Sequence, residues 1–266
     1  MLPTNNELVA VFEQKYSPLT ATGWGPRLRA KFGYFTPDDV YESLISRLVT
    51  TSTVWLDIGG GRDLLPTNPE LATMLASRCR LLVGVDPSDN IQDNHFVHQR
   101  AQTTIDGFQT DRRFDLITMR MVAEHITDPI RAAGSIAGLL STHGRVVIYT
   151  VNKWSAVTMT SWLVPFCLHH RIKSLLWGSE ERDTFPVAYK MNTRGTLRKL
   201  FEAVGLQEEA FLYVDDCRTF ARWRALSTLE ILIWRLLRSF GMHYPETCLL
   251  AVYRTTGTIA DSATPL

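Results

Sequence analysis

The stretch Val54–Asp63, VWLDIGGGRD, decides the fold of this chain. Its first half is a short apolar run, which is typical of a strand buried on both faces of a sheet. In its second half, three successive glycines allow a tight turn and let a ligand approach the backbone N–H groups closely. A buried strand that ends in a glycine turn indicates an open α/β sheet with a ligand at the carboxyl end of its strands.

Further apolar runs alternate with segments in which apolar residues recur at helical spacing. This alternation predicts a doubly wound α/β domain with a mostly parallel sheet and a last strand that is antiparallel. The strands are expected at Leu81–Val85, Phe114–Thr118, Arg145–Tyr149, Ala210–Val214 and Cys248–Tyr253, and the helices at residues 69–80, 130–140, 193–203 and 219–240.

A chain of 266 residues is long for one domain but within the range of an α/β domain with insertions. We therefore expect a single domain over residues 1–266, with helical cap insertions. It divides into an N-terminal cap (1–50), a cofactor-binding core (51–152), a cap insertion (153–190) and a C-terminal half of the core (191–255).

The charge balance argues against nucleic acid as a partner, because 28 basic and 27 acidic residues leave a net charge of only +1. The first residues lack the pattern of a secretory signal, and no apolar run approaches the roughly 18 residues of a spanning helix. We therefore expect a cytoplasmic protein. The four cysteines form no C-x-x-C pair, which favours reduced thiols over disulfides or a structural zinc site.

A second acidic residue, Asp86, closes the next predicted strand, where a carboxylate can accept hydrogen bonds from both hydroxyls of a ribose. Together with the glycine turn it predicts a nucleoside-containing ligand. A dinucleotide fits poorly, because Leu64 stands where its third glycine belongs and Asp57 would repel a pyrophosphate. Asp57 instead suits a ligand that carries an ammonium or sulfonium group.

At these residues the sequence resembles the class I S-adenosylmethionine-dependent methyltransferases, in particular the small-molecule branch that includes quinone-biosynthesis enzymes. The resemblance rests on DIGGG at 57–61, Asp86, FDLI at 114–117, EHITDP at 124–129 and GRVVI at 144–148. It implies a seven-stranded Rossmann-like sheet and S-adenosylmethionine as cofactor. Two positions depart from the family pattern, Asp63 in place of a glycine and Arg100 in place of an acid beside the adenine.

The resemblance also implies a role for each residue of the cofactor site. Asp57, Gly59 and Gly61 would shape the methionine side of the pocket and Asp86 would bind the ribose. Ala101 and Gln102 would lie along the adenine, and the Met119 backbone would accept from the methionyl ammonium.

Methyl transfer to a hydroxyl needs a base, and histidine is the side chain best suited to that role near neutral pH. The catalytic candidates are His125, after the fourth strand, and the pair His169 and His170 in the cap insertion. Each also has a structural interpretation, as a turn residue or as an exposed helix end. We expect no metal, because the histidine pair has no third ligand at a recognisable spacing. Tyr16 and Trp24 are candidates to fold over the cofactor.

The acceptor is expected to be a small molecule, either apolar or linked to a lipid. An apolar stretch at 162–166 and a helical pattern at 222–238 rich in arginine, tryptophan and aliphatic residues support this hypothesis. The second segment has three interpretations: an ordinary packed helix, a peripheral membrane contact or a homodimer interface. A protein that binds S-adenosylmethionine without catalysing transfer, as a partner or regulator, is the alternative function.

Overall fold

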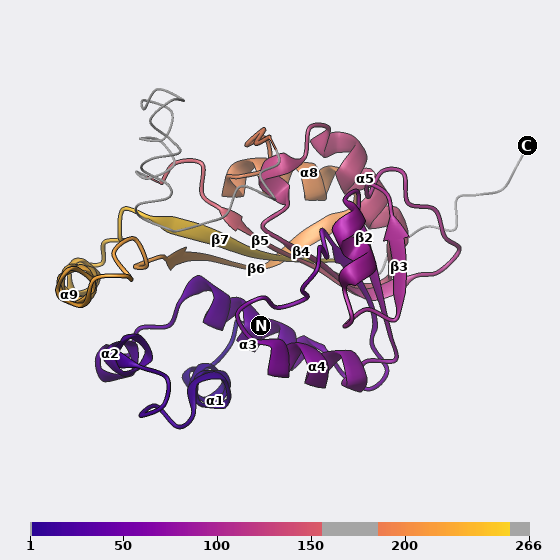
Figure 1. The fold of residues 1–266 in the computed structure, drawn as a ribbon. Helices are drawn as coiled ribbons and strands as arrows, with labels where there is room; N and C mark the ends of the chain where they lie inside the picture. The colour runs from indigo at the N-terminus through magenta and orange to yellow at the C-terminus, as the bar shows by residue number, and fades with distance from the viewer. Residues whose placement is uncertain (1, 156–185, 256–266) are drawn as a thin grey trace, which may run out of the picture.

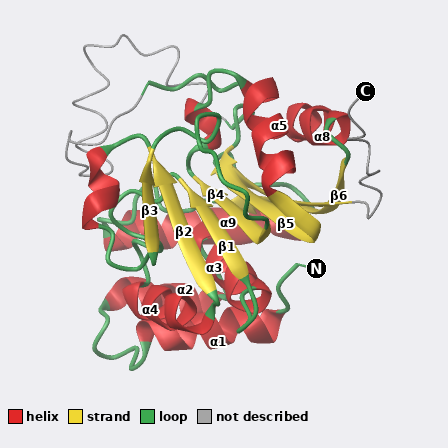
Figure 2. Ribbon diagram, turned by 90° about the vertical axis from the view of Figure 1, so that its right-hand side faces the viewer, coloured by secondary structure: helices red, strands yellow, loops and turns green. Residues whose placement is uncertain are grey.

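The computed structural model describes residues 2–155 and 186–255. A seven-stranded sheet in the order β3-β2-β1-β4-β5-β7-β6 forms the centre of the molecule (Figures 1 and 2). The strands are β1 (Val54–Ile58), β2 (Leu81–Asp86), β3 (Gln99–Gln102), β4 (Phe114–Arg120), β5 (Leu140–Val151), β6 (Leu206–Asp215) and β7 (Thr247–Thr255).

The pairing of the strands confirms the predicted fold class. β1 runs parallel to β2 and β4, β2 runs parallel to β3, and β4 runs parallel to β5. β7 lies between β5 and β6 and is antiparallel to both. Six of the seven strands therefore point the same way, and their carboxyl ends meet at one edge of the sheet.

Helices cover both faces of this sheet (Figure 1). α3 (Pro37–Leu48) and α4 (Pro69–Arg78) lie on one face with α1 (Asn5–Tyr16), and α5 (Pro129–Leu139) and α8 (Arg194–Ala203) lie on the other. Two apolar clusters fill the layers between sheet and helices. Trp55 belongs to the first cluster and Ile58 to the second, because successive side chains of a strand point to opposite faces.

Several elements differ from the expectations. β5 begins five residues before the expected Arg145, and β6 begins four residues before the expected Ala210. β3 has the sequence QRAQ, whose polar and partly exposed side chains give no buried-strand pattern. The helix expected from residue 219 begins five residues later, as α9 (Arg224–Ser239). The N–H groups of Thr219 and Phe220 donate to the Glu230 carboxylate, so this part of the chain folds back on α9 instead of continuing it.

α9 and α2 (Trp24–Phe32) lie beside each other at one end of the molecule (Figure 1). A small apolar cluster around Tyr34, Ile231 and Trp234 joins the two elements, with the Tyr34 and Trp234 rings 5.0 Å apart. The short helices η1 (Asp89–Asp93) and η2 (Ala123–His125) follow β2 and β4. No helix in the described ranges is both long and apolar enough to span a membrane.

Candidate functional site

Strand register brings the predicted cofactor residues to one place. Ile58 at the end of β1 pairs with Val85 of β2 on one side and with Met119 of β4 on the other. Asp86, the last residue of β2, pairs with Gln102. The carboxyl ends of these neighbouring strands therefore place the glycine turn, Asp86, Ala101, Gln102 and Met119 along one continuous edge.

The glycine turn has a geometry that other residues would not accept. Gly59 has a φ of +75°, and a Cβ added there would lie 2.0 Å from Cγ2 of Val122. Gly61 also has a positive φ, of +41°, with open space where a Cβ would lie. The N–H of Gly59 donates to the Val85 carbonyl at 2.7 Å. The turn is therefore held against the end of β2, while its outer part leaves room for a ligand.

Asp86 links the turn to its own strand and loop. Its Oδ2 accepts from the Gly61 N–H at 3.0 Å, and its Oδ1 accepts from the Ser88 N–H at 2.8 Å. These two bonds fix the orientation of a carboxylate that is only 7% exposed. Each oxygen has a further lone pair, which suits the two hydroxyls of a ribose.

Asp57 is buried beneath the turn with little to stabilise its charge. Its Oδ1 accepts from the Thr118 hydroxyl at 2.6 Å, and Thr118 in turn accepts from the Trp55 indole N–H at 2.7 Å. No salt bridge to Asp57 occurs within the described ranges. Burial raises the pKa of Asp57 to about 7, although the Thr118 hydrogen bond and the charge of Arg120 act in the opposite direction.

These features fit S-adenosylmethionine. A buried carboxylate whose pKa is raised by burial is a suitable partner for a ligand ammonium or sulfonium, because the ligand's positive charge favours the ionised form. Asp86 suits the ribose, and half-buried Ala101 with exposed Gln102 offers an edge for the adenine. Met119 is fully buried near the end of β4, where it pairs with Ile58 of β1 and Ile148 of β5.

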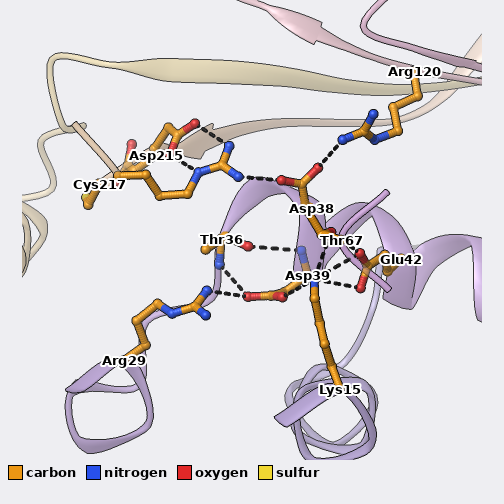
Figure 3. A network of polar contacts seen from close by, with 12 residues as sticks. Lys15, Arg29, Thr36, Asp38, Asp39, Glu42, Thr67, Arg120, Asp215 and Cys217 are labelled. Carbon is orange, nitrogen blue, oxygen red and sulfur yellow. Dashed lines mark hydrogen bonds and ion pairs between the residues drawn. The ribbon is translucent and has the colours of Figure 1, made fainter. Parts of the chain in front are cut away.

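A partly buried ionic network, not predicted from the sequence, joins the N-terminus of α3 to the end of β4 and to the segment after β6 (Figure 3). Asp38, at the N-terminus of α3, accepts from Arg120 at 2.8 Å and also from Arg218. Arg218 forms a second ion pair with Asp216 at 2.6 Å. Burial alone would raise the pKa of Asp38, but the two guanidinium groups outweigh it and lower that pKa to about 2. Arg120 directly follows Met119, so the network reaches the cofactor edge.

A second group of charges lies next to it on α1 and α3 (Figure 3). The Lys15 ammonium donates to Asp39 at 3.0 Å, to Glu42 at 2.9 Å and to the Thr67 hydroxyl at 3.0 Å. Arg29 of α2 also reaches Asp39, at 3.4 Å. These contacts tie α1, α2 and α3 to one another and, through Thr67, to the loop that follows β1.

A cavity of about 260 Å³ lies between the N-terminal helices and the start of α9. Its lining combines aromatic, cationic and apolar side chains. The residues are Lys15, Tyr16, Trp24, Gly25, Arg29, Thr36, Asp38, Thr67, Cys217, Arg218, Ala221, Ser227 and Ile231. Tyr16 and Trp24, candidates from the sequence, line this cavity.

The sequence held only weak signals for this network and cavity. Asp38 and Asp39 follow Thr36 and Pro37, a pattern that is explained by capping of α3 alone. Arg218 lies 180 residues from Asp38 along the chain. Nothing in the local pattern indicates that they pair.

Of the catalytic candidates, His125 lies in η2, and His169 and His170 lie outside the described residues. The Nδ1 atom of His125 lies 2.9 Å from the Pro186 carbonyl. Because a carbonyl only accepts, Nδ1 carries the proton and Nε2 is the basic nitrogen of the neutral ring. The described residues contain no cluster of three or more metal-binding side chains.

Comparison with known proteins agrees with this geometry. The sequence profile of a family described as methyltransferase domain matches residues 34–210. The ubiquinone biosynthesis O-methyltransferase of Coxiella burnetii (strain Dugway 5J108-111) is 24% identical over 162 residues, which cover 58% of this chain and 67% of that protein. The ubiquinone biosynthesis O-methyltransferase of Bradyrhizobium sp. (strain ORS 278) is 34% identical over 113 residues, 39% of this chain and 42% of that protein.

Among solved structures, a putative S-adenosylmethionine dependent methyltransferase from Listeria monocytogenes superposes with a TM-score of 0.53 at 10% identity. The match covers 82% of this chain and 96% of that one, and at this identity it shows the fold alone. The family profile spans α3, the glycine turn, Asp86 and β4. The chain belongs to the methyltransferase domain family and is an S-adenosylmethionine-dependent methyltransferase.

Proposed function

We propose that the protein methylates an oxygen atom of a small hydroxylated molecule, either free or as the head group of an apolar or lipid-linked molecule. The cofactor supplies a methyl group on a positively charged sulfur, which a hydroxyl oxygen can attack. The protein has to bind the acceptor in line with that methyl group and remove the hydroxyl proton.

The cavity beside the ionic network carries this proposal. It shares Asp38 with the network, and Asp38 binds Arg120, the residue after Met119. An acceptor held there would lie next to the methionine side of the cofactor site. An apolar cavity of about 150 Å³ accommodates benzene. A volume of about 260 Å³ therefore suits a substituted ring or a head group of similar size.

The lining favours a polar aromatic acceptor. Tyr16 and Trp24 offer surfaces on which a ring can stack, and Ile231 adds an apolar wall. Lys15 and Arg218 are already paired with carboxylates, so they supply hydrogen-bond donors without a large net charge. Two relatives are O-methyltransferases of ubiquinone biosynthesis, which supports oxygen as the acceptor atom.

Filling the cavity is expected to impair acceptor binding selectively. Ala221 is exposed at the rim of the cavity, so Ala221→Phe places a ring there without disturbing the core. We expect the acceptor KM to rise at least about tenfold, roughly 1.4 kcal/mol, while the Kd for S-adenosylmethionine stays unchanged. The measurement is transfer of labelled methyl to a panel of phenols, catechols and hydroxyquinones, with amines and thiols alongside.

Ala203→Phe is the matched control, because Ala203 is exposed at the end of α8 on the other face of the sheet. Methylation of amines or thiols alone would contradict the choice of oxygen. If the acceptor KM of Ala221→Phe were unchanged, the acceptor would not bind in this cavity.

We further propose that the base is one of the three histidines, with His125 the first to test and His169 and His170 the remaining candidates. His125 lies in η2 and is not among the residues that line the cavity, so it would have to act on an acceptor bound at the cofactor edge. The Pro186 carbonyl holds the ring in the tautomer whose Nε2 can take a proton. His125→Ala is expected to lower kcat about 100-fold and to leave the Kd for S-adenosylmethionine within about twofold. The control is His143→Ala, because His143 is exposed on the long strand β5. If His125→Ala kept full turnover, His125 would not be the base, and its ring would have only the structural role of holding the segment at Pro186.

A further inference from the structure

The outer surface of α9 carries a row of exposed apolar side chains. Leu229 is 54% exposed, Leu236 is 58% exposed and Phe240, which follows the helix, is 70% exposed. Leu226, Leu232 and Ile233 are also exposed and belong to the same row. With about 100° between successive residues, these six side chains fall within roughly 120° of the helix circumference. We call them the outer face of α9.

The opposite side of the helix is fixed to the body of the protein. Ile231 and Trp234 are buried against Tyr34, and the Trp234 indole N–H donates to Asp215 at 3.0 Å. Because the inner side is already packed, the outer face is an additional apolar surface and does not belong to the core. Soluble domains do not normally collect this many large apolar side chains in one exposed row.

The exposed charges of α9 itself are of one sign. Arg224 and Arg235 are exposed along one margin of α9, between its inner side and its outer face, and Arg238 is exposed near the C-terminus of the helix, with its guanidinium over the Trp234 ring. The acid of the helix, Glu230, is turned inward and accepts from the backbone of Thr219 and Phe220. The outer face therefore presents apolar side chains with a cationic border.

We propose that the outer face of α9 docks onto the surface of a membrane that contains anionic lipids. Leucine, isoleucine and phenylalanine would enter the boundary between headgroups and acyl chains, and the arginines would reach the lipid phosphates. A second copy of the chain is a poorer occupant of the outer face. If two α9 helices packed antiparallel about a two-fold axis, their arginine margins would lie on the same side of the interface and would repel each other. The helix has no exposed acid with which to neutralise them.

The helix α9 also forms one wall of the cavity. Ser227 and Ile231, on the inner side of α9, line the cavity together with Trp24 and Gly25 of α2. A membrane on the outer face would thus lie one helix away from the proposed acceptor site. This connection rests on the proposed function and fits a lipid-linked acceptor, whereas the docking itself rests on the outer face and its arginines.

Flotation of the whole 266-residue chain with lipid vesicles tests the proposal. We expect the protein to float with vesicles of phosphatidylcholine and phosphatidylglycerol at low salt, and to float much less with pure phosphatidylcholine or at high salt. The double variant Leu229→Gln/Leu236→Gln should lower the bound fraction at least about tenfold, and Arg224→Gln/Arg235→Gln should remove most of the preference for anionic vesicles.

The matched control is Met74→Gln/Ile130→Gln, which changes two exposed apolar residues on α4 and α5 and should float like the wild type. Each variant is first shown to bind S-adenosylmethionine with the wild-type Kd, which establishes its fold independently of any acceptor. Absence of flotation with anionic vesicles at low salt would overturn the proposal. If the protein does not float but sediments as a dimer, and Leu229→Gln/Leu236→Gln dissociates that dimer, the outer face binds a second copy of the chain instead of a membrane. Methylation of water-soluble acceptors tests the proposed function separately from docking.

Discussion

Replacing Asp38 with alanine is expected to lower the free energy of unfolding by about 3–5 kcal/mol, because it leaves two arginines partly buried without their shared carboxylate. Asp38 is 3% exposed and accepts from both Arg120 and Arg218. Arg218 keeps its ion pair with Asp216, whereas Arg120 loses the one salt bridge that the described residues give it. Urea denaturation at pH 7 measures the effect.

The pH dependence of stability gives a second measure of the same carboxylate. The pKa of Asp38 is about 2 in the folded protein, below its ordinary value of 3.8. Its contribution is therefore fully present above about pH 4 and is lost as the pH falls through 2. Asp38→Ala should remove this part of the acid dependence.

The control for Asp38→Ala is Asp93→Ala. Asp93 is 69% exposed and pairs with the exposed Arg62 at 3.5 Å, so its loss should change the stability by less than about 0.5 kcal/mol. If both variants lost the same free energy of unfolding, the network around Asp38 would stabilise the fold no more than an exposed ion pair does.

Replacing Asp57 with asparagine is expected to stabilise the cofactor-free protein and to weaken cofactor binding. At pH 8 the wild type holds a buried, ionised carboxylate whose pKa of about 7 lies well above the ordinary 3.8. At about 1.4 kcal/mol for each pKa unit, Asp57→Asn should raise the free energy of unfolding by roughly 2–4 kcal/mol at that pH. The same change removes the negative charge proposed to attract the cationic methionine end, and we expect the Kd for S-adenosylmethionine to rise at least about tenfold.

The sign of both effects follows from proton binding. Between about pH 4 and pH 7 the folded wild type binds the Asp57 proton more tightly than the unfolded chain does, so the wild type loses stability as the pH rises through this range. The advantage of Asp57→Asn should therefore be small near pH 4 and full by pH 8. Wild-type affinity for the cofactor should rise with pH through 7, with release of a proton, and that pH dependence should vanish in the variant.

Denaturation at several pH values and calorimetric titration at pH 6 and pH 8 measure these effects. The matched control is Asp63→Asn, an exposed carboxylate in the same turn, which should change neither quantity appreciably. An Asp57→Asn variant with wild-type stability and wild-type affinity at both pH values would remove Asp57 from the cofactor site.

The sequence determined the sheet and the cofactor edge because both depend on local patterns. Buried strands show as continuous apolar runs, and the glycines at 59–61 and Asp86 stand directly at the ends of two of them. Once parallel pairing is inferred, the register itself places these residues side by side. The fold and a nucleoside-containing ligand therefore followed from residues that are close in sequence to the strand ends, and the family resemblance that these residues carry implied S-adenosylmethionine. The edge strand β3 was not predicted, because its side chains are mostly polar and exposed.

Only the tertiary structure decided which distant charges meet and which side of a helix is left uncovered. Asp38 and Arg218 pair across 180 positions, and neither has a local pattern that predicts the other. The periodicity of α9 indicates a helix, but apolar residues occur on both its sides. Packing against Tyr34 then selects Ile231 and Trp234 as the inner side and leaves Leu229 and Leu236 outside. Such choices depend on the shape of the surface that receives the helix, and no sequence window contains that shape.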